Sequence, residues 1–494
     1  MSNGKIENPG GLRVIRNLFF AGPALTVRGA QAAIIVILIT KGLGTQSYGT
    51  WVQVIATVSL LGPTLTLGLE RVLTRYLPEL FNAKAQAKLF LSLLIVVLAL
   101  NVSFALVLYL VSPFFASFIA ADVSKVPVIA GLIGFTLVGI NTNTLVSEFY
   151  RGQLRIRAHA FLWIGRDIGW IAIVFLLVSN DFSIEQIVLA FSVWLVFVSS
   201  IGLMGMLVTV GWPGISYDNL KEHLRYGLPI AFAHPLGWLS KFGSFYFISI
   251  ILGTAAVGVY GSIRTISESL VLISGVMLLV LSPTMARFYS IGEIEQVRRY
   301  MGLAVYGFVT FSLPLAILGT IYAEQLLRVV TNEEIINEGV SVVPYLFFGM
   351  VILGIYGILS EVIPLTKRTW RYFVITGTMS IVQVPVNLLL LPVIGLRGSA
   401  IAEVAAYSVG TIVCLFWCWK NLGLNLEKTK LIKVIFSSFL ALLSAYWIPR
   451  EGAGLLLGVF VFGLTYLGSA VLIGGIPPRL IKSYAIAMVR ATKI

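Results

Sequence analysis

The chain has 494 residues, of which 58% are hydrophobic and only 11% are charged. Soluble domains carry about 25% charged residues, so this composition excludes a soluble protein and indicates a membrane protein. The net charge of +14 does not indicate nucleic-acid binding. The basic residues lie in short loops between apolar segments and form no cluster with interleaved aromatic residues.

A membrane-spanning helix needs roughly 20 mostly apolar residues. The sequence therefore predicts an all-α polytopic membrane protein with about fourteen transmembrane helices. The predicted spans are 17–40, 47–69, 87–110, 126–149, 160–179, 186–208, 226–251, 255–283, 299–321, 342–364, 370–392, 398–419, 431–449 and 453–475.

The loop charges test this count independently, because cytoplasmic loops of membrane proteins are rich in Lys and Arg. With the N-terminus inside, 27 of the 35 Lys and Arg residues fall in cytoplasmic loops or tails, and Arg166 is assigned to this group. One span more or fewer would reverse every later loop and destroy the asymmetry. The pattern predicts a multi-pass protein of the cell membrane (plasma or inner membrane) with both termini in the cytoplasm.

A sequence motif in the first half of the chain recurs in the second half. Residues 43–45 (Leu-Gly-Thr) with Gly49 recur as residues 252–254 with Gly258, at an offset of 209 residues. An even number of predicted spans separates the two copies, so the repeat is parallel. Parallel repeats in membrane transporters are related by an axis along the membrane normal, and their interface is the natural binding site.

The repeat defines the predicted domains. They are an N-terminal six-helix lobe at 1–215, a second six-helix lobe at 216–422, and two additional helices with a cytoplasmic tail at 423–494. We interpret this organisation as that of a transporter.

We single out five ionisable residues in predicted spans, where each costs at least about 2.5–3.5 kcal/mol on insertion scales. They are Arg28, Lys241, Arg264, Glu268 and Glu403. The offset of 209 places Lys241 one helical turn from the position equivalent to Arg28, so both lobes carry a cation at similar depth. We interpret these two, with Arg264 and with Gln31 one turn after Arg28, as a cationic site for an anionic headgroup. The alternative is a set of buried ion pairs.

The acids in the spans allow two interpretations. Glu268 lies one turn after Arg264 and can pair with it, or it can titrate as an ion-coupling group while Arg264 binds the anion. Glu403, near the outer end of its span, is a second candidate coupling group, or it is solvated. Coupling to H⁺ or Na⁺ is the energy source that these residues suggest.

Glu148 and Glu361 end the fourth and tenth predicted spans at an offset of 213 residues. A carboxylate at a helix C-terminus opposes the helix macrodipole, so each needs a basic partner. Arg151 is near Glu148, and Lys367 or Arg368 is near Glu361. We interpret these groups as inner-face ion pairs, and the two acids as a candidate inner gate.

The sequence lacks the motifs that are typical of several kinds of enzyme chemistry. It contains no phosphate-binding loop with the spacing of an ATPase, and no spacing typical of metal ligands or of an activated nucleophile. Cys414 and Cys418 are small residues on one predicted helix, with no further ligands nearby. We therefore expect a protein that is not an enzyme and has no cofactor and no metal.

Two segments resemble a known family. Residues 42–51 (GLGTQSYGTW) and 68–77 (GLERVLTRYL) resemble the first hairpin of polysaccharide and lipid-linked oligosaccharide flippases, within the multidrug/oligosaccharidyl-lipid/polysaccharide exporter superfamily. Residues 252–260 repeat this pattern, and residues 395–402 resemble the turn into the family's twelfth helix.

The resemblance implies a V-shaped pair of six-helix lobes plus two extra helices, with alternating access and no ATP hydrolysis. The implied substrate is a polyprenyl-phosphate- or pyrophosphate-linked glycan moved from the cytoplasmic to the outer leaflet. Such proteins use cationic residues in their central cavity, including residues on the first and eighth helices. Arg28 and Arg264 match these by helix and depth. The implied partners are the lipid-linked glycan, the bilayer and other glycan-assembly membrane proteins.

Two alternatives follow from the same features. A cation-coupled multidrug exporter of the same superfamily would need acids inside the membrane, whereas the mid-span charges here are mostly basic. A membrane glycosyltransferase, polymerase or ligase would need larger extramembrane loops than this chain has.

Overall fold

The computed structural model describes residues 27–112, 126–366, 368, 370–424 and 426–475, in which every regular element is a helix. Within these residues, twelve helices are long and apolar enough to cross a membrane, or thirteen if the bent pair of α2 (Thr45–Leu65) and α3 (Leu69–Tyr76) forms one span. The first predicted span is described only from residue 27, in a helix over 27–43. The all-α polytopic fold is confirmed, and fourteen is an approximate count of its spans.

The helices follow the predicted order. Each predicted span from the second onward overlaps one long helix. The remaining elements are η1 (Leu77–Glu79), α4 (Ala83–Val111), α6 (Val126–Gly152), α7 (Ile156–Ser179), α8 (Ile184–Val210), α9 (Leu220–Leu252), α10 (Thr254–Ser290), α11 (Ile294–Ile321), α12 (Ala323–Val330), α13 (Glu333–Gly339), α14 (Val343–Ser360), α15 (Val362–Leu365), α16 (Arg371–Ile394), α17 (Leu396–Leu422), α18 (Lys428–Tyr446) and α19 (Ala453–Leu472).

The two copies of the repeated motif have the same backbone geometry. Gly44 precedes α2 with φ 85° and ψ 175°, and Gly253 separates α9 from α10 with φ 89° and ψ 174°. L-residues rarely adopt positive φ, so both turns require glycine. The sequence repeat is therefore a structural repeat at this turn.

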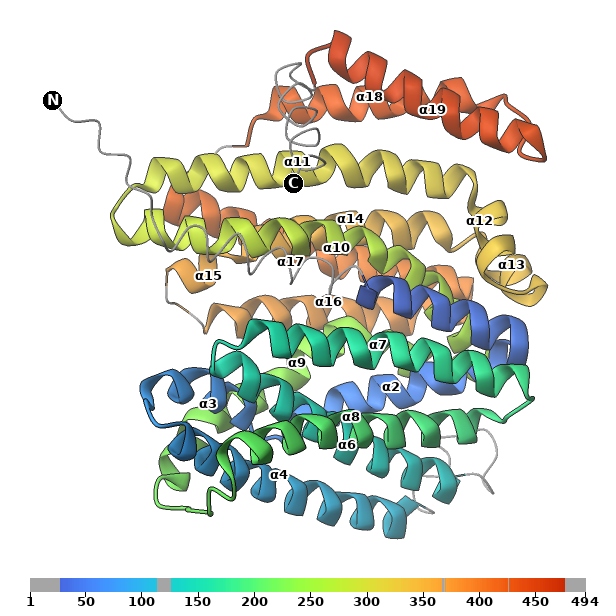
Figure 1. The fold of residues 1–494 in the computed structure, drawn as a ribbon. Coiled ribbons are helices and arrows are strands. Elements are labelled where there is room, and N and C mark those ends of the chain that lie inside the picture. Colours follow the sequence, from blue (N-terminus) through green and yellow to red (C-terminus); the bar gives the residue numbers. More distant parts are fainter. Residues whose placement is uncertain (1–26, 113–125, 367, 369, 425, 476–494) are drawn as a thin grey trace, which may run out of the picture. The chain divides into compact units, whose positions relative to one another are not determined.

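The chain folds into two compact units. Unit 1 comprises Met1–Thr265 and Asn387–Leu396. Its α4, α6 and α8 lie side by side (Figure 1), because their buried faces meet in one apolar core. In that core Phe90 stacks on Phe149 with 4.5 Å between the ring centroids.

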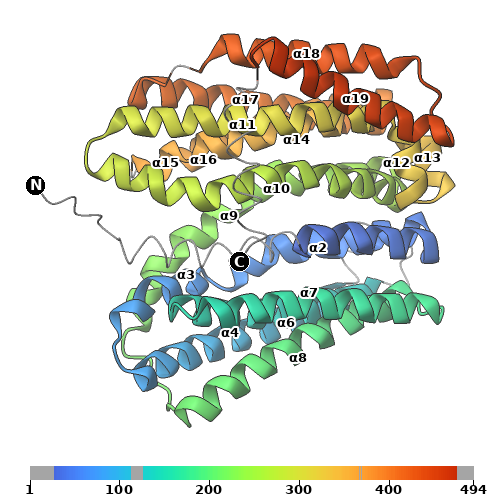
Figure 2. The same ribbon diagram turned by 45° about the horizontal axis from the view of Figure 1, so that its top comes forward.

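Unit 2 comprises Ile266–Val386 and Arg397–Ile494. Its last two helices, α18 and α19, pack on each other, and both contact α11 (Figures 1 and 2). The Tyr466 hydroxyl of α19 donates a hydrogen bond to the carbonyl oxygen of Thr310 on α11 at 2.6 Å. The two additional helices thus attach to the ninth predicted span.

Unit 1 contains α9 and the start of α10 as well as the helices of the first predicted lobe. The contacts of α9 and the α10 start with α2 therefore lie inside one unit. The lobe boundary inferred from the repeat, between 215 and 216, stays a prediction.

Candidate functional site

The three predicted binding cations lie in unit 1, and each lies against an aromatic ring. Arg28 is exposed on the helix over 27–43, Lys241 is exposed on α9, and Arg264 is buried on α10. A cation over an aromatic face gains about 0.5–1 kcal/mol at an exposed site and about 2 kcal/mol or more when desolvated. The rings therefore favour a fixed position for each positive group.

The first aromatic contact centres on Trp163 of α7. The guanidinium carbon of Arg28 lies 5.4 Å from the Trp163 ring centroid, and that of Arg166 lies 5.5 Å from it. The Trp163 indole N–H donates a hydrogen bond to Ser147 Oγ on α6 at 2.6 Å, which fixes the ring. One anchored ring thus contacts two guanidinium groups. We call Arg28, Trp163, Arg166, Asp167 and Asn143 the tryptophan cluster.

Arg166 was assigned to a cytoplasmic loop from the sequence, and that assignment is wrong. Arg166 lies near the middle of the 24-residue α7, inside a candidate span. Its Nε donates to Asp167 Oδ1 at 2.7 Å, and its Nη1 donates to Asn143 Oδ1 at 3.2 Å. Asp167 is 4% exposed. The cluster therefore contains an ion pair within the membrane-spanning region.

The second aromatic contact centres on Phe242 of α9. Lys241 Nζ lies 5.1 Å from the ring centroid, and the Arg264 guanidinium carbon lies 5.6 Å from it. Arg264 also lies 5.5 Å from the Phe245 ring centroid and is only 2% exposed. The structure thus brings Lys241 and Arg264 to one ring. We call Lys241, Phe242, Phe245 and Arg264 the phenylalanine cluster.

The other predicted site residues lie elsewhere. Gln31 is half-buried on the helix over 27–43, and Glu268 is half-buried on the unit 2 part of α10. Glu403 is 1% exposed on α17 and accepts a hydrogen bond from the Tyr407 hydroxyl at 3.3 Å. The interpretation of Glu403 as a solvated group is therefore wrong, because its carboxylate is buried.

The two acids of the candidate inner gate have different partners. Glu148 Oε2 lies 2.6 Å from Arg151 Nη2, so the predicted ion pair on α6 is confirmed. Glu361 accepts a hydrogen bond from Ser282 Oγ at 2.7 Å, within unit 2. Lys367, one of its two predicted partners, lies outside the described residues. The gating role of these acids stays a prediction.

Among the described residues, the two cysteines are not grouped with further metal-ligand side chains. Cys414 and Cys418 are buried thiols on α17. In the part of the chain that the structure describes, no group of three or more His, Cys, Asp or Glu residues is placed to hold a metal ion.

Comparisons with known proteins agree with this fold. The MatE family model matches residues 229–389. The probable low-salt glycan biosynthesis flippase Agl15 of Haloferax volcanii is 21% identical over 289 residues, covering 55% of this chain and 57% of that protein. The chain thus matches little more than half the length of this curated relative.

Two solved structures share the fold over most of their length. The lipid II flippase MurJ, in an inward closed conformation, has a TM-score of 0.75 at 12% identity and covers 92% of this chain and 98% of its own. An inward-facing multidrug resistance MATE family transporter of the MOP superfamily has a TM-score of 0.67 at 17% identity, with coverages of 81% and 94%. The family match over residues 229–389 and these two structures make the chain similar to members of the multidrug/oligosaccharidyl-lipid/polysaccharide exporter (MOP) superfamily.

Together with the candidate membrane-spanning helices of the described residues, these similarities indicate a multi-pass membrane protein. Sequence reasoning found Arg28, Lys241 and Arg264 but missed Trp163, Arg166 and Asp167. The adjacent Arg166-Asp167 dipeptide inside the predicted span 160–179 was the available signal, because two charges within an apolar segment need a partner or a function. The rings were not predicted, because aromatic residues are common throughout the spans.

Proposed function

We propose that this protein is a transporter of the MOP superfamily, and within it a flippase for a polyprenyl-phosphate- or pyrophosphate-linked oligosaccharide or polysaccharide repeat unit. It would move this substrate from the cytoplasmic to the outer leaflet. The observation that carries the proposal is the pair of ring-supported cation clusters around Trp163 and Phe242. A fourth cation, Arg166, joins the predicted Arg28 in the first of them.

The physical argument starts from desolvation. An unpaired phosphate charge is very costly in hydrocarbon, and fixed cations beside a hydrated path reduce that cost. Arg28 and Arg264 can each bind two phosphate oxygens, and Lys241 acts as a point charge. The aromatic rings restrict where the cations move, so less conformational entropy is lost when the phosphate binds. The prenyl chain would stay in the lipid.

Both flippase relatives support the same substrate class. Agl15 is named a glycan biosynthesis flippase, and MurJ is named a lipid II flippase. Alternating access, driven by an H⁺ or Na⁺ gradient, is the mechanism that we propose. The protein would then be a transporter rather than an enzyme, located in the cell membrane with both termini in the cytoplasm, and acting beside other glycan-assembly proteins.

A multidrug exporter is the second candidate function. The MatE match and the MATE neighbour support it, as do the two buried acids Asp167 and Glu403. A cationic drug would need a carboxylate as its partner, but the Asp167 carboxylate already holds Arg166 at 2.7 Å. The two clusters as defined contain four cations, Arg28, Arg166, Lys241 and Arg264, and one acid, Asp167. We therefore favour an anionic substrate.

Deletion of the gene in its native host separates the two functions. A flippase predicts that a lipid-linked glycan accumulates in the cytoplasmic leaflet and that a plasmid copy of the gene removes it. Mass spectrometry of the extracted lipid would identify the substrate. Unchanged lipid-linked glycans, together with increased sensitivity to cationic drugs, would reject the flippase and support the exporter.

A further inference from the structure

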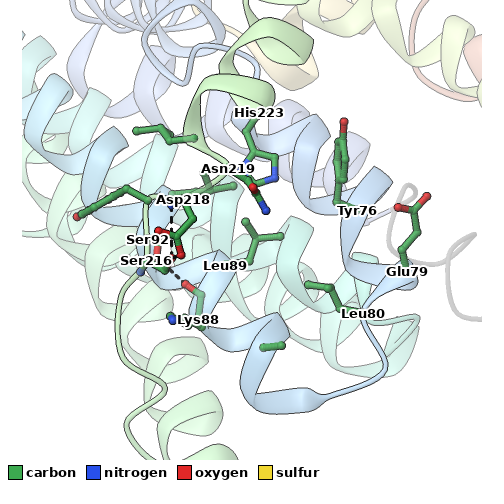
Figure 3. A pocket seen from close by; sticks show the side chains of 14 residues that line it. Tyr76, Glu79, Leu80, Lys88, Leu89, Ser92, Ser216, Asp218, Asn219 and His223 are labelled. Atoms are coloured by element: carbon green, nitrogen blue, oxygen red, sulfur yellow. Dashed lines mark hydrogen bonds between the residues drawn. The ribbon is translucent and has the colours of Figure 1, made fainter.

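A cavity of about 250 Å³ lies in unit 1, beside the connector 211–219 that joins α8 to α9 (Figure 3). The other walls come from η1, the first turns of α4 and the start of α9. Lys88, Ser92, Asp218, Asn219 and His223 provide much of its polar lining. This cavity contains none of the residues of the tryptophan and phenylalanine clusters.

The acids in its wall already have partners. The Glu79 carboxylate accepts a hydrogen bond from Arg75, and the Asp218 carboxylate accepts one from Ser216 Oγ. Ser92 Oγ accepts a hydrogen bond from the Ser216 N–H at 2.9 Å, which attaches the connector to α4 (Figure 3). The acceptors of the cavity are thus largely satisfied within the protein.

The donors of the cavity are less well satisfied. His223 is 7% exposed, and its ring makes no hydrogen bond with the residues that the structure describes. The ring meets Tyr76 edge-on, with 5.2 Å between the centroids. Lys88 is half-buried and forms no ion pair with any described residue. The exposed Asn219 side chain, which precedes α9, makes no capping hydrogen bond with that helix, so the side-chain amide N–H groups are a further set of donors in the lining. Together these donors favour an anion with several oxygen acceptors.

The position of the cavity indicates which anion is available to bind there. Two candidate spans, Ala83–Val111 and Leu220–Leu252, begin at its walls, so the cavity lies where the protein enters the membrane. Aromatic side chains are exposed in the adjoining segments, with Phe81 at 101%, Trp212 at 65% and Tyr217 at 47%. Exposed aromatic residues are typical of the level of the lipid headgroups, where phosphate is the abundant anion.

We propose that this cavity binds the phosphate group of a membrane phospholipid. Lys88, His223 and the Asn219 amide hold the phosphate oxygens, and the acyl chains lie outside, against the exposed aromatic side chains. Because the connector 211–219 forms one wall, a bound lipid holds it against α4. The site is separate from the proposed path of the transported substrate.

Binding to the purified full-length protein in detergent tests the proposal. The thermal unfolding midpoint is titrated with dioleoylphosphatidylglycerol, with dioleoylglycerol, which has the same chains and no phosphate, and with inorganic phosphate. We expect saturable stabilisation by the phospholipid alone. Lys88→Gln, which removes the positive charge, and His223→Leu, which removes the imidazole donor, should each raise the half-saturating lipid concentration at least about fivefold.

Two variants serve as controls. Lys84→Gln changes an exposed lysine one turn earlier on α4, outside the cavity, and should leave the titration unchanged. Lys88→Arg keeps the charge and should retain most of the binding. Equal titrations for Lys88→Gln and the wild type would overturn the site. Equal stabilisation by dioleoylglycerol or by inorganic phosphate would overturn the assignment to a lipid phosphate.

Discussion

Gly49 of α2 and Gly258 of α10 hold equivalent positions in the two copies of the repeat, and each packs on the first turn of the other's helix. A Cβ atom at Gly49 would lie 2.1 Å from the carbonyl oxygen of Thr254, and one at Gly258 would lie 2.1 Å from that of Thr45. This reciprocal contact explains the repeated motif. Glycine at both positions lets two helix backbones approach directly, as small residues do in membrane helix pairs.

Gly49→Ala should destabilise the protein. The added methyl group has only backbone to displace, and such overpacking costs about 1–3 kcal/mol. The measurement is the thermal unfolding midpoint in detergent. Gly275→Ala is the matched control, because a Cβ atom there meets no atom within 4 Å. Equal midpoints for the Gly49 and Gly275 variants would show that the helix crossing is looser than described.

Trp163→Leu should impair transport more than Trp163→Phe. Leucine removes the aromatic face that contacts Arg28 and Arg166, whereas phenylalanine keeps it and loses only the hydrogen bond to Ser147. Loss of two cation–π contacts of about 0.5–1 kcal/mol each predicts a fall in the transport rate of roughly five- to thirtyfold. The rate is measured in reconstituted vesicles, and similar rates for the two variants would argue against a role for the ring.

Asp167→Asn should destabilise the protein strongly. It leaves the guanidinium charge of Arg166 inside the membrane-spanning region without its carboxylate partner, which typically costs about 3–5 kcal/mol. The double variant Arg166→Met with Asp167→Leu removes both charges and should unfold at a higher temperature than Asp167→Asn. If the single variant is as stable as the wild type, Arg166 does not depend on this ion pair.

Glu403→Gln tests ion coupling. Glutamine can still accept the hydrogen bond from Tyr407, but it cannot change its charge. If Glu403 couples transport to an ion gradient, the variant should retain exchange at equal ion concentrations and lose the stimulation by an imposed H⁺ or Na⁺ gradient. Glu268→Gln is measured beside it. Full stimulation in both variants would place the coupling group elsewhere.

The sequence predicted the helices well, because each span is a long apolar segment bounded by charged or glycine-containing turns. Arg166 was misassigned because it lies only a few residues after the start of the predicted span 160–179, and charge counting places such a residue in the neighbouring loop. Its pairing with Asp167 lets it lie near the middle of α7.

Contacts between helices could not be predicted from one sequence. Trp163 contacts Arg28, and Lys241 and Arg264 contact the same Phe242 ring. These contacts depend on how each helix is rotated and where it crosses its neighbour. The same holds for Ser282, whose hydroxyl bonds to Glu361. The pair of Glu148 and Arg151, one turn apart on one helix, did follow from spacing alone.

Translocation of a fluorescent polyprenyl-pyrophosphate-linked sugar in reconstituted vesicles tests the central claim most directly. Arg28→Ala and Lys241→Ala should each reduce the rate at least about tenfold, since each removes a charged partner of the phosphate, worth about 1.5–3 kcal/mol. Lys221→Ala, at an exposed lysine in the first turn of α9, should leave it unchanged. Wild-type rates in both cation variants, at equal reconstituted amounts, would contradict the account.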